Sequence, residues 1–210
     1  MDGRLPTGID VLDRQLEGGF PPGSIVLFSA PPFSQSELFL YEFTAMRSTL
    51  YLTTVRSDQA VADAFDRTAD QTQIGDPTIR EIGVEAPIDQ AGKLIGTLSE
   101  ESTLIIDTIN QLEEQDAGQY RYFLNQLQTQ LENTNSVAIL HGLDGHSVDA
   151  GRDLTAQMAD LVFDLTTRIQ GTEVTSRLSV PKFRGGRALD ETIKLKLTAG
   201  IEIDTSRDIA

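Results

Sequence analysis

The sequence predicts an α/β fold built on a mainly parallel central sheet with helices on both faces, extended by antiparallel strands at its C-terminal end. Between residues 24 and 141, short apolar runs alternate with helix-length stretches, the pattern of strands joined by helical crossovers. After Asp160 the pattern changes to strand-length segments separated by short turns. Short turns suffice only for antiparallel neighbours, so this last part extends the sheet in that way.

The elements follow from their apolar patterns. Buried strands are expected at 24–30, 49–54, 78–83, 103–107 and 136–141. Helices are expected at about 35–47, 58–69, 89–99 and 118–132, the last with an apolar face of Tyr122, Leu124, Leu127 and Leu131. The antiparallel strands are expected at 161–169, 173–180, 192–197 and 200–204. Because no linker, repeat or low-complexity tract interrupts this order, we expect a single domain over residues 1–210.

The composition excludes several classes of protein. No apolar run approaches the roughly 18 residues of a membrane span, and no signal-like segment precedes the globular pattern, so we expect a soluble cytoplasmic protein without a membrane partner. The chain has no Cys and two His, His141 and His146. The absence of Cys excludes thiolate sites, and two His are too few for a histidine-rich metal site. No metal is therefore expected.

The charge is strongly acidic. Thirty-two Asp and Glu oppose 17 Lys and Arg, for a net charge of −15, and Asp exceeds Glu as Arg exceeds Lys. This balance resembles that of proteins from halophilic archaea that accumulate salt, where dense ions screen the repulsion among carboxylates. An ordinary acidic protein is the alternative. Either interpretation makes nucleic acid an unlikely ligand, because binding to phosphates requires a basic patch.

Several short motifs stand in a fixed order along the chain. Thr7-Gly8-Ile9-Asp10 and Pro22-Gly23-Ser24 precede the first strand, and Ile105-Ile106-Asp107 ends a later one. Lys182-Phe183-Arg184-Gly185 precedes Gly200-Ile201. In these motifs the chain resembles the KaiC-like members of the RecA/RadA ATPase superfamily. The resemblance covers nearly the whole chain and implies a RecA-like P-loop NTPase fold.

The resemblance places a phosphate-binding loop, Walker A, after the first strand. A working loop reads G-x-x-x-x-G-K-[ST], since its lysine reaches the phosphates and its hydroxyl holds Mg²⁺. The key positions here are Ala30, Gln35, Ser36 and Glu37. The whole degenerate remnant is Ala30, Pro31, Pro32, Phe33, Ser34, Gln35, Ser36 and Glu37. We therefore expect no cofactor, although weak ATP binding through apolar packing of the adenine stays open.

The same loop carries a local helix-start signal. Ser34-x-x-Glu37 fits a capping box, and Phe33 with Leu38 fits the hydrophobic staple that accompanies such boxes. With Glu37 at its positive end, the helix would be satisfied without a phosphate. The sequence therefore predicts a loop that caps itself.

The catalytic positions implied by the resemblance are also changed. Active relatives end the second strand with two glutamates that orient the attacking water, and this chain has Val55 and Arg56, neither of which can act as a base. No catalytic residue is therefore expected. Asp107 is the Walker B remnant, either a vestigial cation site or a structural carboxylate, the second being favoured. If it faces Glu37, either a cation lies between them or one pKa rises.

Two further strand-end residues, Thr108 and His141, are expected to be structural. Lys182 and Arg184 match the pair that reaches a neighbour's γ-phosphate in KaiC-like rings, so they form a possible trans finger; a basic turn paired with surface carboxylates is the alternative.

Three functions are compatible with these observations. The favoured hypothesis is an inactive pseudo-ATPase that binds a protein partner in archaeal signalling or regulation. The partner could be an active KaiC-like paralogue or a second copy. The alternatives are a non-hydrolysing subunit that supplies Lys182 and Arg184 to an active paralogue, and a recombination mediator that binds single-stranded DNA.

Overall fold

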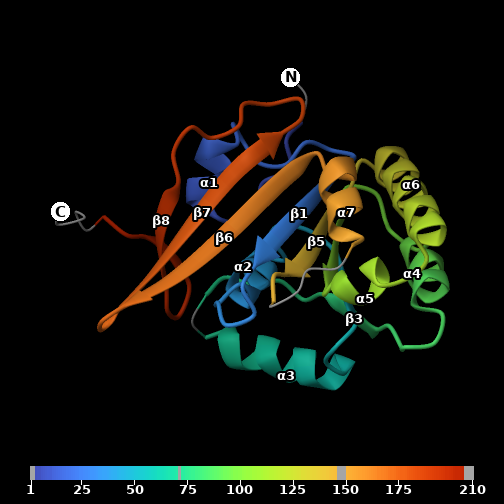
Figure 1. Ribbon diagram of the computed structural model, residues 1–210, viewed down its shortest axis with the longest axis horizontal. Coiled ribbons are helices and arrows are strands. Elements are labelled where there is room, and N and C mark those ends of the chain that lie inside the picture. The colour runs from blue at the N-terminus through green and yellow to red at the C-terminus, as the bar shows by residue number, and fades with distance from the viewer. Residues whose placement is uncertain (1–2, 71, 146–149, 206–210) are drawn as a thin grey trace.

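A single nine-stranded sheet runs through the part of the chain that the computed structural model describes, residues 3–70, 72–145 and 150–205; His146 lies outside these ranges. The strand order is β3-β2-β4-β5-β1-β6-β7-β8-β9 (Figure 1). The strands from β3 across to β6 are parallel, and β7, β8 and β9 continue the sheet in antiparallel pairs. The α/β fold predicted from the sequence is therefore confirmed.

The strands lie close to their predicted positions. Their bounds are β1 Ser24–Ala30, β2 Thr49–Thr53, β3 Thr78–Glu81, β4 Thr103–Asp107, β5 Val137–Leu143, β6 Leu161–Gln170, β7 Glu173–Phe183, β8 Ile193–Leu197 and β9 Ile201–Ile203. The central strands β1, β4 and β5 are almost wholly buried on both faces, which is why they read as continuous apolar runs.

The helices agree less closely with the prediction. Their bounds are α1 Asp10–Gln15, α2 Glu37–Glu42, α3 Asp58–Thr68, α4 Pro87–Ile95, α5 Asn110–Glu113, α6 Ala117–Thr134 and α7 Arg152–Met158. α2 is much shorter than the helix expected at 35–47. Beyond Glu42 the chain makes i to i+3 turns, and the hydroxyl of Thr44 donates to the carbonyl oxygen of Tyr41 at 2.6 Å. A side chain that binds the backbone locally in this way competes with continuation of the helix.

The predicted apolar face of α6 is wrong at one position. Leu124, Leu127 and Leu131 are buried as expected, together with Tyr120, but the side chain of Tyr122 is 64% exposed. Successive residues are separated by about 100° around a helix, so Tyr122 points well away from the buried stripe.

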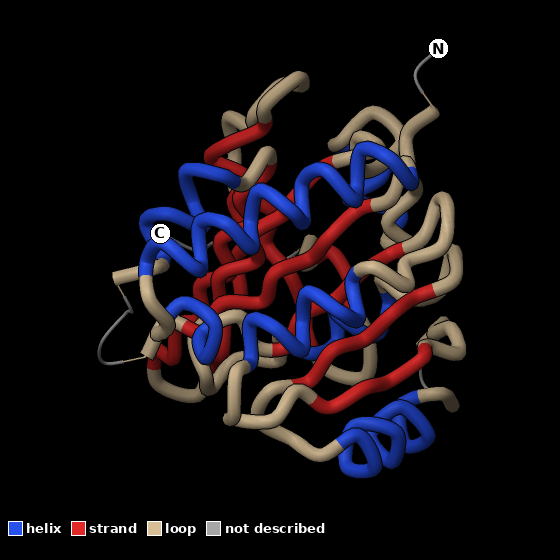
Figure 2. Tube along the Cα trace, turned by 90° about the vertical axis from the view of Figure 1, so that its right-hand side faces the viewer, coloured by secondary structure: helices blue, strands red, loops and turns tan. Residues whose placement is uncertain are grey.

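Two hydrophobic cores lie on opposite faces of the sheet. On β1, Val26 and Phe28 join the core with α1, α2 and α3, and Ile25 and Leu27 join the core with α4, α5, α6 and α7. Figure 2 shows two of the helices of the second layer, α4 and α6, side by side in front of the strands. The parallel strands end at a common edge, and the loops that follow β1, β2, β4 and β5 meet there.

An aromatic cluster fixes α2 against this edge. The ring of Phe28 on β1 lies 5.1 Å from that of Phe39, 6.5 Å from that of Phe43 and 6.5 Å from that of Phe163, all between ring centroids. All four side chains are buried. Aromatic pairs at such distances add to the free energy of area burial, so the cluster holds the short α2 in place.

We expect Phe28→Ala to lower the free energy of unfolding by about 3 to 5 kcal/mol, because it leaves a cavity at the centre of this cluster. Phe33→Ala is the matched control, since Phe33 is 69% exposed and its loss should change stability by less than about 0.5 kcal/mol. Urea unfolding of both variants measures the difference. Equal effects at the two positions would contradict the role assigned to the cluster.

Candidate functional site

The loop between β1 and α2 is closed by its own hydrogen bonds, but not by the predicted capping box. The first residue of α2 is Glu37, and its N-cap is Ser36, whose side chain makes no capping bond. The Ser34 hydroxyl instead donates to the carbonyl oxygen of Pro31 at 2.7 Å, and its backbone N–H donates to the same oxygen at 3.0 Å. The capping box is therefore wrong, because the helix begins later than the local signal indicates.

The predicted hydrophobic staple is also wrong. Phe33 is 69% exposed while Leu38 is buried, so Phe33 does not share the burial of its expected partner. Pro32 and Gln35 are exposed as well. The loop between β1 and α2 thus presents a solvent-facing turn.

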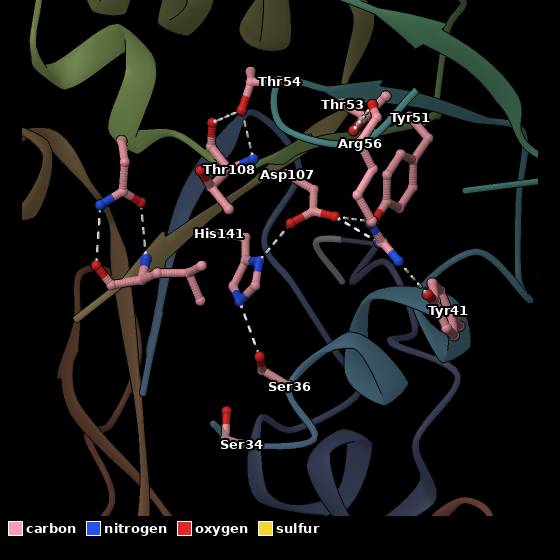
Figure 3. A network of polar contacts seen from close by, with 12 residues as sticks. Ser34, Ser36, Tyr41, Tyr51, Thr53, Thr54, Arg56, Asp107, Thr108 and His141 are labelled. Atoms are coloured by element: carbon pink, nitrogen blue, oxygen red, sulfur yellow. Dashed lines mark hydrogen bonds and ion pairs between the residues drawn. The ribbon is translucent and has the colours of Figure 1, made fainter. Parts of the chain in front are cut away.

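The centre of the site is the carboxylate of Asp107, at the end of β4. Its Oδ1 lies 2.8 Å from Nδ1 of His141, on the neighbouring strand β5 (Figure 3). Its Oδ2 accepts from the hydroxyl of Tyr51 at 2.7 Å and from Nη2 of Arg56 at 3.0 Å. Asp107 is 6% exposed, so these three groups replace the water that it loses on burial.

The network continues from Asp107 into α2 in two directions. His141 Nε2 lies 3.1 Å from Oγ of Ser36, at the N-cap of the helix. Nη1 of Arg56 donates to the hydroxyl of Tyr41, on the body of the same helix, at 3.4 Å. Ser34 lies nearby without joining the network (Figure 3). The site therefore links β2, β4, β5 and α2 through side chains alone.

The electrostatics keep Asp107 ionised. Burial by itself raises the pKa of Asp107, but hydrogen bonding and charge from His141, then Tyr51 and Arg56, outweigh it and lower the pKa from 3.8 to about 2. Burial also lowers the pKa of Arg56, and its contacts with Tyr41, Tyr51 and Asp107 raise it above the ordinary value. The core of the site is thus a charged carboxylate and guanidinium pair.

The expected conflict between Asp107 and Glu37 does not occur. The Asp107 oxygens face His141, Tyr51 and Arg56, and the pKa of Asp107 falls rather than rises. The Arg56 guanidinium supplies the positive charge beside Asp107. No group of three or more His, Asp or Glu residues that could hold a metal ion occurs within the described ranges.

The residues of the Asp107 site do not fit a nucleoside triphosphate bound with Mg²⁺. The lysine position holds Ser36, which is 2% exposed and bonded to His141. The carboxylate that would face hydrated Mg²⁺ already holds a guanidinium. A phosphate-bound cation would compete with that ion pair, and breaking the pair would leave Arg56 without its carboxylate partner.

The order Asp107, His141, Ser36 is also that of a hydrolase triad, with a carboxylate on one imidazole nitrogen and a hydroxyl on the other. A nucleophile must reach its substrate, and Ser36 is buried. Arg56 further neutralises the carboxylate that would stabilise an imidazolium. We therefore interpret the arrangement as structural.

A second buried network borders the site. The guanidinium of Arg152, on α7, holds Glu113 on α5 at 2.9 Å and Asp144 after β5 at 2.5 Å. Ser29 on β1 donates to the other oxygen of Asp144. A Cβ atom on Gly142 would lie 2.6 Å from the guanidinium carbon of Arg152, so a larger residue here would have to displace the guanidinium. Arg152 therefore connects the segment after β5 to helices α5 and α7.

Lys182 and Arg184, the possible trans finger, lie at the opposite end of the sheet from the degenerate loop. Lys182 pairs with Val162 near the start of β6, and β6 runs parallel to β1. The Lys182 amino group donates to the carbonyl oxygens of Ala156 at 2.7 Å and Gln157 at 3.0 Å, at the C-terminal end of α7. Such a contact satisfies carbonyls that a helix leaves unpaired.

Arg184 holds the same corner. Its guanidinium donates to Asp160 Oδ1 at 3.0 Å and to the carbonyl oxygen of Gln157 at 3.1 Å. Burial and the neighbouring Arg184 lower the pKa of Lys182. Both cations are therefore engaged within their own chain, as the basic-turn alternative requires, and the finger stays a prediction.

Sequence reasoning singled out Ser36, Arg56, Asp107 and His141, which the structure brings together, but it missed Tyr41, Tyr51 and all the connections. Arg56 was interpreted only as a lost base, and His141 only as a structural residue. A signal was present, because Asp107 and His141 are direct partners in the β4 and β5 register, two positions at adjacent strand ends. Thr108, also expected to be structural, is held through its backbone N–H by the Thr54 hydroxyl at 2.9 Å.

Comparison with known sequences places the chain in a protein family. The chain belongs to the family of unknown function DUF7125. The profile of that family matches residues 4–210. No curated protein matches the chain.

Among solved structures, the fold is similar to that of a KaiC-like protein from the hyperthermophilic archaeon Pyrococcus horikoshii OT3. The TM-score is 0.74, the identity is 18%, and the match covers 96% of this chain and 98% of the other. At this identity the likeness supports a KaiC-like RecA fold and does not extend to activity. Within the described residues, no helix has the length and apolar character to cross a membrane.

The lowered pKa of Asp107 gives a pH-dependent prediction. Because the folded pKa of about 2 lies below the ordinary 3.8, the ionised carboxylate contributes stability above pH 4, and this contribution is lost as the pH falls through 2. We expect the stability gap between wild type and Asp107→Asn to shrink by about 2 kcal/mol between pH 5 and pH 2. Urea unfolding across this range measures it.

The matched control for that experiment is Asp66→Asn, on the exposed face of α3. Its gap to wild type should stay nearly constant over the same pH range. A constant gap for Asp107→Asn would contradict the charge pairing described above.

Proposed function

We propose that this chain is a catalytically inactive member of the RecA superfamily, a KaiC-like pseudo-ATPase that acts by binding other proteins in archaeal signalling or regulation. The observation that carries the proposal is the ion pair between Arg56 and Asp107, with Ser36 in the lysine position and bonded to His141. These contacts occupy the groups that would otherwise receive the phosphates and Mg²⁺.

Loss of nucleotide affinity follows from the chemistry of the loop. A phosphate site gains affinity from a lysine and from N–H donors, each charge-assisted bond contributing about 1.5 to 3 kcal/mol. Here the lysine is replaced by a buried hydroxyl, and Glu37 adds a negative charge where the phosphates would lie. Both changes weaken binding of a polyanion.

Loss of hydrolysis follows from the groups after β2. A base must be able to lose its proton near neutral pH, and the raised pKa of Arg56 makes it a permanent cation. Val55 has no ionisable group and is 76% exposed. No residue in this position can orient and deprotonate water.

The proposed mechanism is a fixed scaffold. In a nucleotide-driven switch, the phosphates and Mg²⁺ hold the loops, and the loops are released on hydrolysis. In this chain α2, β2, β4 and β5 are joined by protein groups that need no ligand. One conformation is then presented to a partner at all times, by a single domain of residues 1–210 in the cytoplasm.

The two alternatives receive less support. A role for Lys182 and Arg184 in a neighbour's active site would require both side chains to leave the end of α7 and Asp160. A recombination mediator would have to bind single-stranded DNA with a chain of net charge −15. Both remain hypotheses of lower rank.

The test of lost nucleotide binding is a titration by calorimetry and thermal shift with ATP and Mg²⁺, ADP and adenosine in parallel. We expect no saturation by ATP up to about 1 mM. If a weak adenine site persists, adenosine and ATP should bind alike, because the phosphates contribute nothing. Saturable ATP binding below about 100 μM, tighter than that of adenosine, would overturn the proposal.

We further propose that the protein comes from a halophilic organism, which gives a separate prediction. With a net charge of −15, repulsion among carboxylates acts over a Debye length of about 30 Å at 0.01 M salt and only about 3 Å at 1 M. We expect the thermal midpoint to rise steeply with KCl over this range. A midpoint that is constant with salt would mean that the acidic composition does not reflect adaptation to salt.

A further inference from the structure

The outer surface of α4 and α6 carries a groove of about 470 Å³. The two helices pack side by side over the sheet, on the side of the molecule away from the β6–β7 turn (Figures 1 and 2). Ile95, Phe123 and Leu127 form the floor of the groove and are themselves buried in the core, so the exposed apolar surface is that of Tyr122, which stands on the rim and is 64% exposed. An exposed tyrosine beside an apolar groove is typical of protein interfaces.

The described residues that line the groove are uncharged. Charged residues make up 23% of this chain, yet none of the described residues that line the groove is Asp, Glu, Lys or Arg. Within α6 the charged residues are Arg121 and Glu132, one before and one after the stretch that faces the groove. The opposite faces of surface helices are normally charged, so α6 departs from the usual pattern.

Helix α3 gives the contrast within the same molecule. It exposes Asp58, Asp63 and Asp66 to solvent, where α6 exposes Asn125, Gln126 and Thr129. A protein partner with a basic surface would be attracted to faces like that of α3. A charge-free face instead admits a partner that is itself strongly acidic.

A glycine in α4 points to a close approach at this surface. Gly92 lies inside the helix, where glycine costs about 1 kcal/mol relative to alanine. Apart from the backbone of its own helix, a Cβ atom on Gly92 would meet no atom of the described residues within 4 Å, so no packing contact in the described part of the chain requires glycine there. The missing side chain leaves room in the groove for a group from outside the chain.

We propose that a second copy of this chain docks on this groove across a two-fold axis. Two chains of net charge −15 repel each other, and contact through their uncharged faces keeps the carboxylates of the two copies furthest apart. A two-fold axis brings the same patch of each copy together, so the patch must complement itself. The side-chain amides of Asn125 and Gln126 each donate and accept hydrogen bonds, so they can pair with the same patch of a second copy.

In this arrangement the two α6 helices run antiparallel, with Gln126 near the axis. Tyr122 of each copy enters the groove of the other beside Gly92 and Thr129. The surface is separate from the Asp107 network, so its test decides assembly alone, and the loss of ATP binding is decided by the nucleotide titration.

The experiment measures self-association by sedimentation velocity over a range of protein concentration, at about 0.1 M and about 1 M KCl. We expect a monomer–dimer equilibrium that tightens with salt, because salt screens repulsion between the two acidic chains. Tyr122→Ser and Gln126→Glu should each weaken it at least about tenfold, the first by removing the aromatic anchor and the second by placing like charges at the axis.

The matched control is Gln170→Glu, an exposed position at the end of β6 that adds the same charge far from the groove. It should dimerise like wild type. A wild-type chain that stays monomeric at about 100 μM in 1 M KCl, or a dimer that Tyr122→Ser and Gln126→Glu leave unchanged, would overturn the proposal. A dimer that weakens with salt would also overturn it, because that would indicate pairing of opposite charges.

Discussion

The structure depends on how one buried carboxylate is balanced. Asp107 ends the central strand β4, has almost no contact with water and stays ionised. A buried charge without a partner is costly, so the surrounding fold must supply hydrogen bonds and an opposite charge. Tyr51, Arg56 and His141 supply them from the two strands on either side and from the loop after β2. The same groups position α2. Ser36 contacts the second ring nitrogen of His141, and the Tyr41 hydroxyl accepts from the second terminal nitrogen of Arg56.

Much of the fold could be predicted, because burial on both faces leaves a clear trace in the sequence. Strands β1, β4 and β5 are continuous apolar runs, and the antiparallel strands follow short turns. The start of α2 could not be predicted from local signals. Ser34 matched a capping pattern, but the aromatic cluster around Phe28 and the bond from Ser36 to His141, 105 residues away, set where the helix lies. Tertiary contacts of that kind override a four-residue motif.

The sequence pointed to some positions of the Asp107 network, and to none of its contacts. The resemblance to KaiC-like ATPases directed attention to the changed residues, and each was interpreted as a loss. What Arg56 binds depends on strand register and on the path of the loop after β2, because its partner Asp107 lies 51 residues further along the chain. Secondary-structure propensity and the spacing of motifs carry no information about a contact between residues so far apart in the sequence. Tyr122 is a different case, because the spacing of about 100° per helical residue already turns it away from the buried stripe of α6.

Under the proposed loss of nucleotide binding and hydrolysis, the substitutions at the site are coupled. If the chain had only lost its phosphate lysine and its catalytic base, Asp107 would remain as a buried negative charge whose cation had gone. Arg56 stands where the resemblance places one of the base glutamates, and its guanidinium reaches that carboxylate. A single replacement thus removes the base and restores charge balance, two effects that a surface arginine could not combine. Simple decay of a nucleotide site would not supply this compensation, whereas a fold that must remain stable without a ligand requires it.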